Sequence, residues 1–304
     1  MYRAQLKWQP AAILLLLALV WGANMAIVKI GTREIAPLLM AGLRSLVASF
    51  CLFIWMKIKG IPLFPARTML IHGIIVGIMF GLEFGLIYVG LQYTTASRTY
   101  IILYTSPFFV AIGAHIFLRD DKLNSWKAAG LLVAFCGVAI LFIGDIGAIT
   151  LSALTGDIMA IFAGALWGAT TIYVKRFLAQ HVVPLQTLFY QVFFSAPLLI
   201  LMSIILEDHL VSGFSLMTAF SLFYQCIIVA FLSFIVWFEL IHRYPVSLLH
   251  GFSFFTPVFG VFLSGVLILG ELLSLKLMVA MLLVSMGTLL VNFQPQAKKL
   301  LKTS

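Results

Sequence analysis

The chain alternates long apolar runs with short polar segments. Each run is close to the ~20 residues that an α-helix needs to cross a bilayer. The pattern therefore predicts an all-α polytopic membrane protein with ten transmembrane helices. The predicted spans are residues 10–31, 37–56, 69–92, 98–118, 126–144, 154–174, 184–206, 216–241, 246–268 and 275–293.

Composition supports a membrane protein. Hydrophobic residues make up 63% of the 304 residues and charged residues only 10%, whereas soluble domains carry about 25% charged residues. The net charge of +9 comes from basic residues scattered between the apolar runs. That distribution suits lipid headgroups and topology signals, and it excludes a nucleic-acid partner. The three cysteines lie within apolar runs, with no disulfide or metal-binding pattern.

Basic residues also predict the orientation. With ten spans, both termini lie on one side of the membrane. Fourteen of the 19 lysines and arginines fall in the termini and loops of that side, and four fall on the opposite side. By the positive-inside rule, both termini are expected to be cytoplasmic, with the protein in a bacterial inner membrane.

Two internal alignments predict a duplication. "WGANMAIVK" at 21–29 matches "WGATTIYVK" at 167–175 in five of nine positions, and a second alignment pairs residues 97–137 with 247–287. They predict two five-helix repeats, residues 1–148 and 149–304. An odd number of spans inverts the second repeat relative to the first, as in many secondary transporters.

The order of these motifs resembles the drug/metabolite transporter superfamily, EamA-like branch. The resemblance rests on the Trp-Gly pairs, on the prolines of "YTSPFF" and "FFTPVF", and on the acidic residues of "RDDKL" and "GELLS". It implies an exporter, exchanger or importer of a small metabolite that has no ATP-binding domain. Consistently, the sequence contains no G-x-x-x-x-G-K-[ST] loop.

The third span carries glycines at 73, 77, 81 and 85 and one carboxylate, Glu83. Residues four apart lie on one helix face, so the glycines form a stripe and Glu83 points away from it. A small-residue stripe allows close approach of a neighbouring helix. Glu83 is therefore expected to face protein or a water-filled cavity.

Helix rise places a polar layer about 10 Å below the outer surface. Arg44 and Glu83 are its charged members. They form either a structural ion pair or a site for substrate or a coupling proton, and both readings stay open. The layer comprises Asn24, Arg44, Glu83 and Tyr104, and the repeat places Thr170, Gln191, Ser233 and Phe254 in its counterpart.

Four further residues are candidates for the substrate site. Trp21 and Trp167 are expected to wall it or to pack the core, since aromatic walls suit organic ligands. Tyr100 and His250 occupy equivalent positions in the two repeats, and packing is the alternative role for His250.

The candidate residues favour a secondary transporter. Protease motifs are missing, so an enzyme is not expected, and no cofactor or metal site is predicted. A charged layer in one half only argues against a channel. One cation and one anion are complementary to a zwitterion, such as an amino acid or S-adenosylmethionine. Nucleobases, sugars and cationic drugs stay open as substrates, as do proton coupling and a non-transporting receptor.

Overall fold

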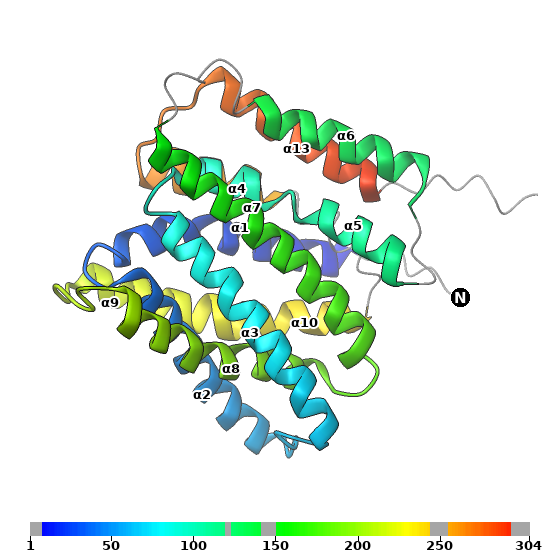
Figure 1. Ribbon diagram of the computed structural model, residues 1–304, viewed down its shortest axis with the longest axis vertical. Helices are drawn as coiled ribbons and strands as arrows, with labels where there is room; N and C mark the ends of the chain where they lie inside the picture. The colour runs from blue at the N-terminus through cyan, green and yellow to red at the C-terminus, as the bar shows by residue number, and fades with distance from the viewer. Residues whose placement is uncertain (1–7, 119–122, 141–149, 244–254, 293–304) are drawn as a thin grey trace, which may run out of the picture.

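The computed structural model describes residues 8–118, 123–140, 150–243 and 255–292, and their regular structure is helical apart from one isolated bridge pair (Figure 1). The first half contains six helices in its described part. They are α1 (Trp8–Gly31), α2 (Pro37–Ile58), α3 (Arg67–Gly90), α4 (Ala96–Leu103), α5 (Ser106–Phe117) and α6 (Ser125–Ile140).

The second half contains both α-helices and π-helices, the latter labelled η. Its described elements are α7 (Leu151–Tyr173), η1 (Val174–Leu178), α8 (Pro184–Leu206), α9 (Leu216–Phe223), η2 (Tyr224–Ser233), α10 (Phe234–Arg243), α12 (Phe255–Gly260), η3 (Val261–Ile268) and α13 (Leu275–Asn292).

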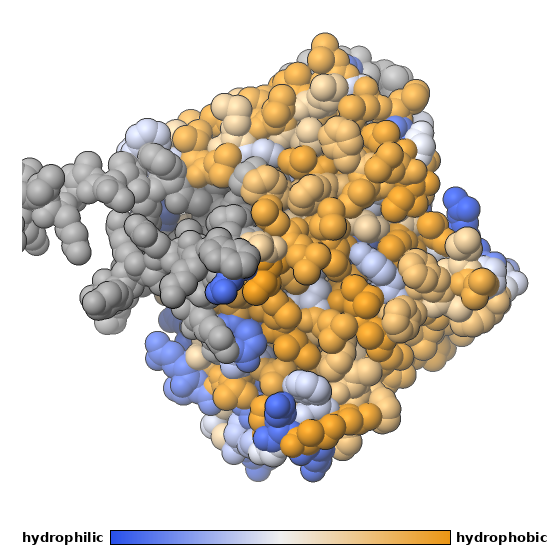
Figure 2. All heavy atoms as spheres, turned by 180° about the vertical axis from the view of Figure 1, so that it is seen from behind, coloured by the Kyte–Doolittle hydropathy of each residue, from blue (hydrophilic) through white to orange (hydrophobic). Residues whose placement is uncertain are grey.

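Seven helical stretches among the described residues are long and apolar enough to cross a membrane. The predicted spans 126–144, 246–268 and 275–293 correspond to shorter apolar helices, so the number ten stays a prediction. Figure 2 shows a broad apolar face on which hydrophilic residues gather mainly near the borders. Such a surface suits contact with lipid acyl chains. The apolar helices and this apolar surface together indicate an integral membrane protein.

The predicted span 98–118 consists of two helices, α4 and α5. Tyr104 and Thr105 separate them, and the Thr105 hydroxyl donates a hydrogen bond to the Ile102 carbonyl oxygen (2.7 Å). Pro107 follows in the first turn of α5, where its missing N–H breaks no helical hydrogen bond. Sequence reasoning treated this span as one helix because both parts are apolar.

The glycine stripe of α3 packs against α8, which confirms the predicted close helix contact. A Cβ added at Gly73 would lie 2.8 Å from the Tyr190 ring, and one at Gly77 would lie 2.3 Å from the Phe194 Cβ. At Gly81 the nearest atom would be 3.0 Å away, on Leu198. Only glycine permits this approach, because any side chain would push the two backbones apart.

Most of the close helix pairs join the two halves. α2 packs on α8 and η2, α3 on α7 and α8, α4 and α5 on α7, α1 on α12, η3 and η2, and α6 on α13. In the α6–α13 pair, which forms the top layer of Figure 1, Gly137 approaches Ala280 and Gly287 approaches Ala134. The halves are thus interleaved, and a cavity lies between them.

Candidate functional site

The cavity has a volume of about 350 Å³ and is lined by residues of both halves. This volume falls within the ~300–1,000 Å³ typical of small-molecule sites. His250 lies outside the described residues. The other nine predicted site residues all line the cavity, namely Trp21, Asn24, Arg44, Glu83, Tyr100, Tyr104, Trp167, Thr170 and Gln191.

Arg44 projects from α2 into an aromatic box and is fully buried. Its guanidinium carbon lies 4.0 Å from the ring centroid of Phe84, 5.2 Å from that of Phe234 and 5.9 Å from that of Phe80. None of its three side-chain nitrogens has a hydrogen-bond partner among the described residues. Aromatic faces attract a cation but accept none of the five N–H bonds that a guanidinium offers. Arg44 is therefore equipped to bind an anionic acceptor.

Glu83 lines the same cavity from α3 and is 5% exposed. It lies on the side of α3 away from the glycine stripe, as the helix period predicted. Within the described part of the chain, no Arg44 nitrogen lies within 4.0 Å of its carboxylate oxygens. The direct ion pair that the sequence left open is therefore not formed, and the cavity presents a guanidinium and a separate carboxyl group.

Neutral polar groups complete the wall. Asn24 on α1 and Thr170 on α7 occupy equivalent positions in the internal alignment. The Oδ1 atom of Asn24 and the hydroxyl of Thr170 are buried without a hydrogen-bond partner in the described chain. Buried polar groups are normally paired, so both are available to a polar ligand. Gln191 joins them from α8.

The hydroxyl of Tyr100 forms hydrogen bonds with the backbone of helix α1. It lies 2.5 Å and 2.7 Å from the carbonyl oxygens of Trp21 and Gly22, and it accepts a hydrogen bond from the amide of Met25 (3.1 Å). The ring of Tyr100 still lines the cavity. Its expected role in substrate binding stays a prediction that depends on the ring alone, because its polar group holds α4 against α1.

The tryptophans and Tyr104 form aromatic walls. Trp21 donates a hydrogen bond from Nε1 to the hydroxyl of Ser233 (2.8 Å), and its ring meets Trp237 edge to face at 5.1 Å. Trp167 meets Tyr104 edge to face at 5.4 Å. Both tryptophans therefore pack and wall the cavity at once, so the two sequence alternatives are compatible.

Sequence reasoning missed the other aromatic residues of the wall, which are Phe80, Phe84, Phe234, Trp237 and Phe238. On α3, Phe80 and Phe84 lie three residues before and one after Glu83, so the helix period places all three on one face. That signal was available in the sequence. For Phe234, Trp237 and Phe238 we find no comparable signal, since no charged cavity residue lies on η2 or α10 among those that line the site.

A helical membrane protein with an internal cavity lined by unpaired polar groups from interleaved halves is a solute carrier by class. The family model for "EamA-like transporter family" matches residues 9–143 and 154–293. The chain belongs to this family. The membership confirms the resemblance drawn from the sequence motifs, and it indicates a transporter.

Curated relatives cover most of the chain. An uncharacterised transporter of Bacillus subtilis (strain 168), YoaV, is 26% identical over 282 residues, which is 92% of this chain and 96% of the relative. A probable amino-acid metabolite efflux pump of Salmonella typhimurium is 29% identical, covering 86% and 87%. A solved crystal structure aligns with a TM-score of 0.68 at 20% identity, covering 93% and 96%, which shows a shared fold.

Proposed function

We propose that this protein is a secondary transporter, an exporter or exchanger, of an amino acid or an amino-acid-derived zwitterion such as S-adenosylmethionine. The observation that carries the proposal is that the Arg44 guanidinium and the Glu83 carboxyl group line one buried cavity without forming an ion pair with each other. The amino-acid metabolite efflux pump at 29% identity supports the same substrate class.

The cavity chemistry suits a zwitterion. A guanidinium binds a carboxylate through two parallel N–H bonds, and a carboxylate binds an ammonium group through charge-assisted hydrogen bonds. Because no ion pair joins Arg44 to Glu83, each can bind a group of opposite charge on a ligand in this low-dielectric setting. The aromatic walls then contact the apolar part of the substrate.

Inverted repeats and alternating access belong to the proposal. The family match falls in two successive segments, which supports a duplicated unit. The helix contacts also come in equivalent pairs. Contact of α1 with α12 corresponds to contact of α7 with α5, and contact of α2 with η2 corresponds to contact of α8 with α3. A pseudo-two-fold arrangement of this kind allows the halves to rearrange around a central site.

A thermal-shift screen of the purified protein tests the substrate class. Amino acids and S-adenosylmethionine are screened first, and each hit is compared with its methyl ester, which lacks the carboxylate, and its N-acetyl form, which lacks the ammonium. Only the intact zwitterion should stabilise strongly, by about 2.7 kcal/mol at 100 times its Kd. Equal stabilisation by all three forms would contradict the proposal.

Single and double variants test which group of the substrate Arg44 and Glu83 each bind. Glu83→Gln should remove the discrimination against the N-acetyl form, and Arg44→Gln should remove the discrimination against the methyl ester. The Arg44→Gln/Glu83→Gln double variant should fold yet lose flux in proteoliposomes. Ile78→Leu, at an exposed position of α3, is the control and should keep both binding and flux. Near-normal flux through the double variant would show that Arg44 and Glu83 are not needed to bind the substrate, and the neutral residues of the cavity would then be the candidates.

A further inference from the structure

The cavity reaches the surface at one end of the helices and stops inside the protein at the other. Lys175 and Gln180, both exposed near the end of η1, line its mouth. At the opposite end its lining stops at Met25, Ile87 and Tyr100, which are buried. We call these the η1 end and the latch end. The latch end is where α1 and α3 finish and α2 and α4 begin.

Two glutamates of the second half bind helix starts of the first half at the latch end. Glu207, directly after α8, accepts hydrogen bonds from the backbone amides of Leu38 and the next residue of α2 (2.8 and 3.2 Å). Glu271, after η3, accepts them from the amides of Ala96 and the next residue of α4 (2.8 and 3.1 Å). The first amides of a helix lack intrahelical partners and favour anions. Each carboxylate thus caps a helix of the other half.

A third carboxylate makes the reciprocal contact. Glu34, between α1 and α2, accepts hydrogen bonds from the Ser215 amide (2.7 Å) and the Thr218 hydroxyl (2.6 Å) at the start of α9. Beside it, Ile35 and Val211 form an antiparallel bridge pair, flanked by two backbone hydrogen bonds of 2.9 and 2.8 Å. This contact therefore joins backbone to backbone as well as side chain to helix start.

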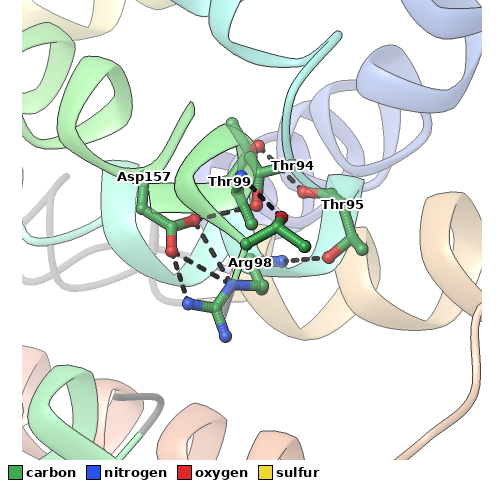
Figure 3. A network of polar contacts seen from close by, with 7 residues as sticks. Thr94, Thr95, Arg98, Thr99 and Asp157 are labelled. Carbon is green, nitrogen blue, oxygen red and sulfur yellow. Dashed lines mark hydrogen bonds and ion pairs between the residues drawn. The ribbon is translucent and has the colours of Figure 1, made fainter. Parts of the chain in front are cut away.

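The fourth carboxylate is fully buried. Asp157 on α7 faces the guanidinium of Arg98 on α4 and accepts a hydrogen bond from the Thr94 hydroxyl (2.8 Å) (Figure 3). The backbones are close here, because a Cβ added at Gly156 would lie 2.7 Å from the carbonyl oxygen of Gly90. Again the contact joins the two halves of the chain.

We propose that Glu34, Asp157, Glu207 and Glu271, the latch carboxylates, form the gate of this carrier. They hold the two halves together at the latch end while the cavity is open at the η1 end, and they release when the cavity opens at the latch end. The inference rests on the carrier function proposed above, since a carrier that opened at both ends together would leak. The hydrogen bonds of Glu34, Glu207 and Glu271 exchange readily for water, because they lie near helix termini outside the apolar spans or at their first turns. Asp157 is buried in the second turn of α7.

Cysteine accessibility tests the gate without any substrate. The three native cysteines are replaced, and Thr170→Cys serves as a reporter inside the cavity. An impermeant maleimide should label it from the η1 side alone. In the Glu207→Gln/Glu271→Gln background, labelling from the latch side should rise at least about tenfold, a difference of about 1.4 kcal/mol in gate opening. Asp208→Asn, an exposed neighbour of Glu207, is the matched control. Unchanged labelling, or an equal rise in the control, would overturn the gate.

A disulfide provides the complementary test if the neutralised variants do not fold. Ile35 and Val211 form a non-hydrogen-bonded antiparallel pair, whose Cα atoms are typically about 4.5 Å apart, within the range that a disulfide spans. Oxidised Ile35→Cys/Val211→Cys in the cysteine-free background should stop flux, keep ligand stabilisation, and recover flux on reduction. Full flux with the disulfide confirmed by mass spectrometry would overturn the gate. If the unmodified protein binds none of the tested ligands, that result counts against the proposed substrate and not against the gate.

Discussion

Gly77→Ala tests whether the close approach of α3 and α8 stabilises the fold. The new Cβ would lie 2.3 Å from the Phe194 Cβ and 2.9 Å from the Tyr190 carbonyl oxygen, whereas carbon atoms prefer about 3.5–4.0 Å. Neither neighbouring atom is the far end of a flexible side chain, so the helices must separate. Overpacking of this kind costs about 1–3 kcal/mol. Alanine also gains about 1 kcal/mol of helix propensity over glycine, which masks part of the loss.

Gly85→Ala is the matched control on the same helix. Its Cβ would meet only the Cδ2 atoms of Leu38 and Leu199, at 3.3 and 3.4 Å, and these can move. The propensity gain is common to both variants and cancels when they are compared. Thermal unfolding in detergent should therefore place Gly77→Ala about 2 kcal/mol below Gly85→Ala, roughly 3 °C in Tm for a chain of this length. Equal melting temperatures would refute the argument that the stripe holds α3 to α8.

Two further predictions concern charges near the membrane surface. The Ser215 amide and the Thr218 hydroxyl lower the pKa of Glu34 below its usual 4.5. Its stabilising contribution is therefore present above about pH 4.5 and is lost as the pH falls through the lowered pKa, so the Tm difference between wild type and Glu34→Gln should shrink from about pH 7 to about pH 3. Impermeant thiol reagents should label Lys59→Cys from the cytoplasmic side and Asp208→Cys from the outside, and the reverse pattern would contradict the predicted orientation.

Much of the fold could be predicted because apolar runs and glycine spacing are local signals. The α3 stripe is an example, since the four-residue period fixes which face is small and leaves Glu83 on the opposite face. The break between α4 and α5 was missed. The residues next to the break are apolar on both sides, 101–103 before it and 108–110 after it, and a proline in the first turn of a helix also occurs without a break.

The cavity residues were predicted from depth along the helices, and nine of them do line one cavity. Depth does not specify the distance between two side chains across the cavity. For that reason the sequence could not decide whether Arg44 and Glu83 touch, and it could not show that the Tyr100 hydroxyl binds the backbone of α1. Both outcomes depend on how the helices rotate about their own axes when they pack.

The latch carboxylates show where sequence reasoning stops and why. Glu34, Glu207 and Glu271 each follow an apolar run, so by sequence they look like ordinary charges at the ends of spans. Their common property is that each accepts hydrogen bonds from amides or hydroxyls in the other half of the chain, although Glu207 accepts one from Ser203 of its own half as well. No local pattern encodes that pairing, because it arises only when the two halves interleave. The same interleaving brings Arg44 and Glu83 of the first half together with Thr170 of the second around one cavity. A movement that parts the latch end must therefore also move Arg44 and Glu83 relative to Thr170, which links opening of the gate to release of a substrate bound between them.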